Sequence, residues 1–298
     1  NDRFAFGSKN AMKIYSNFID SNDSFYEGLK SLSKPITFFY DYIPKSQEEL
    51  NQNPYNFIML HEPNEFFGMH DWVANNSHLF SGILTWNQKL IDDCDNAICF
   101  HHSANHFPLS YTDKFKNKIN KNFEVSYLAG VKDLVEGHKL RQEIYKIEDK
   151  INIPKKWFYV MEDFDWEKYK KDGNGRPGQH IAAIAKQKLY DESMFSIVVE
   201  NVNYNNWYTE KISDCFNTKT IPLYWGCPNI SEWGYDERGI IRFNSIDELI
   251  KVTNNLTKKT YIDMKPYVDY NYKIAQKEIK SKEKLESFFI KIIKINNI

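Results

Sequence analysis

The chain has no hydrophobic run long enough to cross a membrane and no recognisable signal peptide. None of its apolar stretches approaches the roughly 20 residues that a membrane-spanning helix needs. Its four cysteines form no Cys-x-x-Cys pair, which argues against the common zinc and disulfide frameworks and favours reduced thiols. We therefore expect a soluble, cytoplasmic protein.

A charge excess of one sign is also missing. The 39 basic and 40 acidic residues give a formal net charge of -1, which argues against a nucleic-acid partner. The C-terminal end is an exception, because residues 251–298 hold 11 Lys against 5 Asp plus Glu, a net of +6. We expect the apolar residues of 286–295 to pack back on the first domain. The alternative is peripheral contact of this basic end with the inner face of an anionic membrane.

What the chain does have is a regular alternation of short β-rich runs with longer amphipathic runs. Two sets of strands are predicted, separated by the polar stretch 112–122. The first set is 35–43, 55–62, 81–87 and 97–102, with a helix at 66–78 between its second and third strands; the second set is 123–130, 157–161, 195–201, 220–226 and 239–243. Helical patterns occupy most of the remaining gaps, at 137–150, 179–191, 209–217, 245–256 and 266–295. This alternation predicts parallel sheets of βαβ units.

The predicted organisation is two α/β domains followed by a C-terminal helix. We assign residues 1–115 to an N-terminal acceptor-binding domain and 116–275 to a donor-binding domain, with 276–298 packing back on the first. In such folds ligands bind at the carboxyl ends of the strands and in the cleft between domains. Glu62, Asn201 and Gly226 stand at predicted strand ends.

Two glutamates lie at or just after the end of the predicted strand 55–62. Glu62 ends the strand just before Pro63, and a carboxylate at a strand end that faces a cleft suits a general base. Glu65, three residues later, competes for that role; it also suits the first turn of a helix, where the dipole stabilises a negative charge. Nearby aromatic residues, Phe66, Phe67, Trp72 and Trp86, are either core residues or a platform for a sugar.

Two cations precede or open predicted helices of the second domain. Arg141 lies just off the apolar stripe of the helix 137–150, and an arginine binds diphosphate through two hydrogen bonds. Lys211 lies in the first turn of the helix 209–217, where a cation is unfavourable unless an anion binds at that turn. The alternative is that both side chains are solvated. The loop 171–178, with Gly175, is a weak phosphate-binding candidate, since it is not a Gly-x-Gly-x-x-Gly sequence.

A metal site is not expected. His101, His102 and His106 are close in sequence, but no cysteine or carboxylate with ligand spacing follows them. No Asp-x-Asp pair ends a strand, and the nearest, at 163–165, lies in a charged loop. A diphosphate site without metal needs cationic side chains and a helix N-terminus, which Arg141 and Lys211 provide.

The segment FSIVVEN…NWYTEKISDCFNTKTIPLYWGCPN (195–229) resembles the donor-site sequence of the α1,3/4-fucosyltransferases, glycosyltransferase family 10. The shared pattern is a strand that ends in Glu-Asn, Thr-Glu-Lys opening a helix, a strand with Ile-Pro and a Gly-x-Pro turn. SYLAG…EGHKLRQEI, KKDGNGRPG and FIMLHEPNEF resemble other parts of the family. The resemblance is strongest over 123–243, and suggests a soluble bacterial or viral-type member.

The resemblance implies a GT-B-like fold, two Rossmann-type parallel-sheet domains facing a central cleft, and an inverting, metal-independent reaction. It implies that Glu62 is the general base and that Arg141 and Lys211 bind the diphosphate. Glu210 would bind ribose or sugar hydroxyls, and Asn201 the phosphate or sugar region. Gly175 lies in the family's glycine-containing loop. Trp207 replaces a tyrosine found in many members, and an indole supplies one N–H and no hydroxyl.

The predicted function is transfer of fucose, or a related sugar, from a GDP-sugar to a hydroxyl of a glycan or glycolipid acceptor, with no cofactor. One alternative is a GT-B transferase that uses a different nucleotide sugar. Another is a non-catalytic glycan-binding protein on this scaffold. The presence of Glu62, Arg141, Glu210 and Lys211 together favours an enzyme, because a decayed site has no reason to keep all four.

Overall fold

The computed structural model describes residues 3–5, 12–16, 36–100, 112–116, 120–130, 132–159 and 189–280. The chain divides into two compact units, Asn1–His102 with Lys280–Ile298, and Ser103–Ile279. This division lies before the predicted boundary at residue 115. Thr112 belongs to the second unit, where its hydroxyl accepts a hydrogen bond from Nε2 of Gln276 (2.9 Å).

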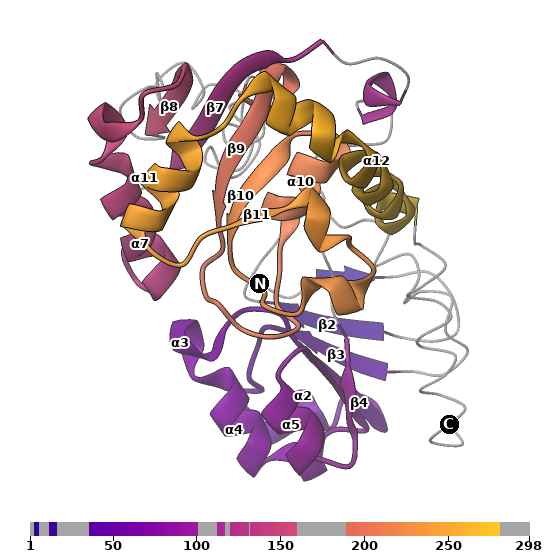
Figure 1. The fold of residues 1–298 in the computed structure, drawn as a ribbon. Helices are drawn as coiled ribbons and strands as arrows, with labels where there is room; N and C mark the ends of the chain where they lie inside the picture. Colours follow the sequence, from indigo (N-terminus) through magenta and orange to yellow (C-terminus); the bar gives the residue numbers. More distant parts are fainter. Residues whose placement is uncertain are drawn as a thin grey trace, which may run out of the picture. The chain divides into compact units, whose positions relative to one another are not determined.

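The first unit is built on a six-stranded sheet whose strands follow one another in chain order (Figure 1). All neighbouring pairs are parallel except β1–β2. The strands are β1 (Arg3–Ala5), β2 (Met12–Ser16), β3 (Ile36–Tyr40), β4 (Tyr55–Leu60), β5 (Gly82–Thr85) and β6 (Ala97–Cys99). The helices are α2 (Gln47–Leu50), α3 (Asn64–Phe67), α4 (Met69–Asn75), η1 (Ser77–Leu79) and α5 (Gln88–Asp93). Sequence patterning predicted β3 to β6 but missed β1, β2, α2 and α5.

The single helix predicted at 66–78 is wrong. The chain forms α3 and α4 instead, separated by Gly68 in the left-handed region (φ 62°). A glycine adopts this conformation without the steric cost that a side chain would add. Oδ1 of Asn64 then accepts the N–H of His70 (2.9 Å), which fixes the start of α4.

The second unit contains a five-stranded parallel sheet in the order β8-β7-β9-β10-β11. Its strands are β7 (Asn122–Ala129), β8 (Lys155–Tyr159), β9 (Ser193–Val199), β10 (Ile221–Trp225) and β11 (Ile241–Arg242). Its helices are η2 (Asp113–Phe115), α7 (Glu136–Tyr145), η3 (Glu148–Lys150), α10 (Glu210–Asn217), η4 (Ile230–Trp233), η5 (Glu237–Gly239), α11 (Ile246–Asn254) and α12 (Lys258–Lys280). The chain order reverses between β7 and β9, so the carboxyl edge there is where this class of sheet binds ligands.

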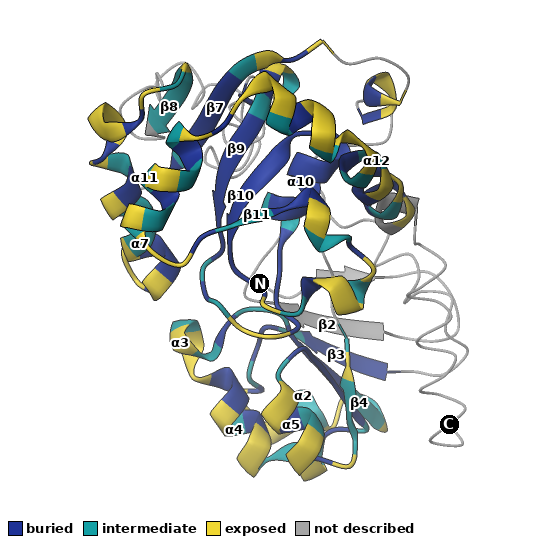
Figure 2. Ribbon diagram, viewed as in Figure 1, coloured by how far each residue is buried: buried dark blue, intermediate teal, exposed yellow. Residues whose placement is uncertain are grey.

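Helices cover both faces of this sheet, with α7 and α11 on one face and α10 on the other (Figure 1). Neighbouring residues of β9 point to opposite faces: Ile197 packs in the core that includes Ile144 of α7, and Val198 in the core that includes Ile212 of α10. Figure 2 shows β9 and β10 buried and the outer surfaces of the helices exposed. Because both faces are covered, the strands read as continuous apolar runs.

Several predicted elements differ from the structure in their limits. The predicted helix 137–150 is α7 followed by the short turn η3. The last helix begins at Lys258, eight residues before the predicted start, and Pro266 lies inside it. Most of 179–191 and all of 281–298 lie outside the described residues, and so does the predicted packing of the C-terminal helix.

Candidate functional site

The reversal between β7 and β9 brings the N-terminus of α7 against the end of β9. The backbone N–H of Gly137 donates to the carbonyl of Asn201 (2.9 Å). A Cβ atom at residue 137 would lie only 1.8 Å from the carbonyl oxygen of Glu200. Glycine is therefore required at the second position of α7, because any side chain would push the helix away from the strand.

Arg141, one turn further along α7, points its guanidinium to Asn201. Its Nη2 donates to Oδ1 of Asn201, and its backbone carbonyl accepts the hydroxyl of Tyr127 on β7 (2.6 Å). The Nε of Arg141 is buried without a hydrogen-bond partner among the described residues. Burial lowers the pKa of Arg141 below its ordinary value. A buried guanidinium with an unused donor is well suited to receive an oxygen of a ligand.

His138 shows that positive charge converges on this edge. Its pKa is lowered to about 4, mainly by burial and then by the positive charges of Arg141, Lys132 and Lys211. The imidazole is therefore neutral near pH 7. The three cations that act on this one buried ring come from α7, the loop before it and α10.

The N-terminus of α10 is organised around the fully buried Glu200. Its carboxylate accepts the backbone N–H of Thr209 (2.9 Å) and the hydroxyl of Thr209 (2.7 Å). Thr209 caps the helix by accepting the backbone N–H of Lys211 (3.3 Å). Nζ of Lys211 lies 2.9 Å from the Thr209 hydroxyl, 3.6 Å from Glu200 and 3.5 Å from Glu210. Two carboxylates thus compensate the lysine at the positive end of the helix dipole.

Four of the predicted donor-site residues lie at this one edge: Arg141, Asn201, Glu210 and Lys211. Trp207 lies in the loop before α10 and is fully buried. Gly175 lies outside the described residues. Sequence reasoning assigned no role to Glu200 or His138, although Glu200 belongs to the Glu-Asn pair that ends β9.

In the first unit, the peptide groups on both sides of Glu62 are fixed by side chains. The buried carboxylate of Asp41 accepts the N–H groups of His61 (2.7 Å) and Glu62 (3.1 Å). Nε1 of Trp86 donates to the carbonyl of His61 (2.9 Å), and Nε2 of His70 lies 2.9 Å from the carbonyl of Glu62. The backbone that carries Glu62 is therefore constrained from three elements. Trp86, for which the sequence left two roles open, is a buried structural residue.

Asp41 is itself unusual. It follows β3 with a positive φ of 42°, which is uncommon for a residue with a side chain. Burial raises its pKa to about 7, and the neighbouring Glu62 also raises it. Glu62 is half-buried, whereas Glu65 is exposed in the first turn of α3. Hydrogen bonds thus fix the backbone at Glu62, whereas Glu65 lies in the first turn of a helix.

Neither a metal site nor a membrane helix is found in the part of the chain that the structure describes. No group of three His, Cys, Asp or Glu side chains there is placed to hold a metal ion. His101, His102 and His106 lie outside it. No described helix is long and apolar enough to cross a membrane.

No family model matches the chain. A segment of 84 residues, 26% of this chain, is 30% identical to the α-(1,3)-fucosyltransferase FucT of Helicobacter pylori, and it spans only 17% of that protein. A crystal structure of an α1,3-fucosyltransferase matches 96% of this chain and 91% of its own, with a TM-score of 0.57 and 16% identity. This segment of the chain is thus similar in sequence to an α1,3-fucosyltransferase, and the fold resembles that of another.

The fold is shared more widely. The structure of TarM matches with a TM-score of 0.51 and 11% identity over 90% of this chain and 57% of that one. The structure of Anabaena Alr3699/HepE in complex with UDP and glucose matches with a TM-score of 0.53 and 9% identity. The match covers 91% of this chain and 81% of that one. The predicted fold class, two parallel-sheet α/β domains of the GT-B type, is confirmed.

Proposed function

We propose that this chain is an inverting, metal-independent glycosyltransferase that moves fucose, or a related sugar, from a GDP-sugar to a glycan or glycolipid hydroxyl. The observation that carries the proposal is the grouping of Arg141, Asn201 and Lys211 at the strand-order reversal, where Arg141 donates to Asn201 and Lys211 lies beside the neighbouring Glu200. The N-terminus of α10, a helix of 8 residues, lies at the same edge, and its dipole favours a bound anion. One related structure of this fold, a fucosyltransferase with GDP, has a TM-score of 0.55.

In the proposed reaction Glu62 takes the proton of an acceptor hydroxyl as its oxygen attacks the anomeric carbon. The bond from that carbon to the diphosphate oxygen breaks, and GDP leaves from the opposite face. Negative charge that develops on the diphosphate is stabilised by Arg141, Lys211 and the dipole of α10. Preorganised donors of this kind each contribute about 3 kcal/mol to lowering a barrier. Asn201 would orient Arg141, and Glu210 would bind sugar or ribose hydroxyls.

A second candidate keeps the fold and changes the nucleotide. The match to Alr3699/HepE, whose structure contains UDP and glucose, favours a UDP-sugar as the alternative donor. Trp207 is relevant to the choice, because it is fully buried and its indole supplies no hydroxyl to a donor.

A thermal-shift screen tests the donor. We expect GDP and GDP-fucose to raise the melting temperature in the presence of EDTA, and UDP and UDP-glucose to leave it unchanged. If only the UDP compounds raise the melting temperature, the donor is a UDP-sugar, as in the second candidate. A strict requirement of binding for Mn²⁺ would contradict the metal-independent site. No response to any nucleotide would favour a glycan-binding protein.

A further inference from the structure

A cavity of about 240 Å³ opens at the carboxyl ends of β10 and β11, beside the proposed diphosphate site but distinct from it. Its lining includes Asn203, Tyr224, Trp225, Gly226, Arg242 and Asn244. Gly226 connects it to the diphosphate site, since a Cβ atom there would lie 2.5 Å from Cγ of Glu200. The carboxylate of the same Glu200 lies 3.6 Å from Nζ of Lys211.

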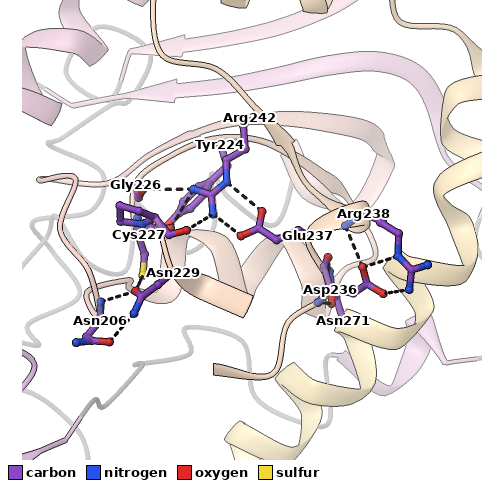
Figure 3. Close-up of polar contacts among 11 residues, drawn as sticks. Asn206, Tyr224, Gly226, Cys227, Asn229, Asp236, Glu237, Arg238, Arg242 and Asn271 are labelled. Atoms are coloured by element: carbon purple, nitrogen blue, oxygen red, sulfur yellow. Dashed lines mark hydrogen bonds and ion pairs between the residues drawn. The ribbon is translucent and has the colours of Figure 1, made fainter. Parts of the chain in front are cut away.

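The one cation of the cavity wall is not available to bind an anion (Figure 3). Nε and Nη2 of Arg242 donate to the carboxylate of Glu237 (3.1 and 2.7 Å). Nη1 donates to the carbonyls of Gly226 (3.4 Å) and Cys227 (2.9 Å), and Nη2 also to that of Pro228 (3.3 Å). A guanidinium has five N–H donors, and these five contacts use them all. The positive charge of Arg242 is therefore offset by the carboxylate of Glu237, and the cavity suits an uncharged group.

The cavity also contains an acceptor that needs a donor. Oδ1 of Asn203 is buried and has no hydrogen-bond partner among the described residues. An unsatisfied buried acceptor is unfavourable, so the site favours a ligand that supplies an N–H or O–H. Aromatic side chains from β10 provide the apolar part of the wall, the usual composition of a small-molecule site with few polar groups.

We propose that this cavity binds the uncharged, hydroxyl-bearing sugar ring of the nucleotide sugar, with Asn203 accepting one of its hydroxyls. The inference rests on the proposed function, because it places the sugar next to the diphosphate at Lys211.

Calorimetric titration of the full chain with GDP and with GDP-fucose tests the assignment. Asn203→Leu keeps the volume and removes the acceptor, and we expect it to weaken GDP-fucose binding about tenfold, as for one buried hydrogen bond, and to leave GDP binding unchanged. Asn205→Ala, at an exposed position of the same loop, should change neither. Melting temperatures of both variants check folding, and Asn203→Ala repeats the test if Asn203→Leu does not fold.

Two results would overturn this inference while the proposed function stands. Equal weakening of GDP and GDP-fucose by the Asn203 variants would mean that the cavity holds the nucleoside. If these variants bind both ligands with the affinity of the wild type, the cavity holds neither the sugar nor the nucleoside. Failure of the wild type to bind either ligand would instead overturn the proposed function, and this inference with it.

Discussion

Nζ of Lys211 lies 3.6 Å from Oε2 of Glu200, a carboxylate that has no exposed surface. The pair connects the residue that follows β9 to the first turn of α10. Thr209 lies between them and hydrogen-bonds to both. A lysine at the positive end of a helix is thereby tolerated in the absence of ligand, and it remains close enough to the surface, at 22% side-chain exposure, to meet an anion.

Glu200→Gln should destabilise the protein. The amide keeps the shape but removes the buried negative charge that offsets Lys211 and accepts from Thr209, and breaking a buried pair in this way costs about 3 kcal/mol. Urea unfolding measures the loss. Asp263→Asn is the control, because Lys259 and Asp263 form an exposed i,i+4 pair whose removal should cost under about 0.5 kcal/mol. Equal losses in the two variants would contradict the role of Glu200.

Arg141→Ala and Lys211→Ala should each weaken GDP binding by about 1.5–3 kcal/mol, the value of a hydrogen bond to a charged group. Calorimetry of the double variant should show a loss smaller than the sum, because both cations act on one diphosphate. Arg238→Ala removes an exposed cation of the same unit, paired with Asp236, and should leave GDP affinity unchanged. Full additivity would place Arg141 and Lys211 on separate ligand groups.

Glu62→Gln should reduce turnover by about 10²–10⁴-fold and leave GDP binding intact, because an amide cannot accept the proton. Release of GDP from GDP-fucose with a panel of glycans measures it. Glu65→Gln is the matched control and should retain full turnover. If Glu65→Gln loses activity instead, the base lies at Glu65; if neither variant matters, it lies elsewhere in the chain.

Asp41 should make stability depend on pH. Its folded pKa of about 7 is above its ordinary value of 3.8, so its contribution is complete below pH 4 and is lost as the pH rises to about 7. Asp41→Asn keeps an acceptor for the two N–H groups but cannot ionise. The difference in unfolding free energy, wild type minus variant, should therefore fall between pH 4.5 and 7.5, by at most about 4 kcal/mol. A difference independent of pH would show that Asp41 titrates with its ordinary pKa.

Much of the fold and of the candidate site was predictable because its signals are local. The apolar runs of β7, β9 and β10 predict buried parallel strands, and the pattern around Thr209-Glu210-Lys211 predicts a helix start. In a parallel sheet, residues that follow neighbouring strands share one edge. The grouping of Arg141, Asn201, Glu210 and Lys211 follows from these two facts.

Other features were decided only by the tertiary structure, because they depend on burial and on contacts between distant residues. Asp41 meets the backbone of Glu62 across 21 residues, through the pairing of β3 with β4, and its raised pKa follows from burial there. Glu200 became the organising carboxylate of α10 because the strand end places it in the interior, where it must be paired. The local pattern determined which residues end each strand; the packing around those ends determined their charge, their partners and the cavity beside them.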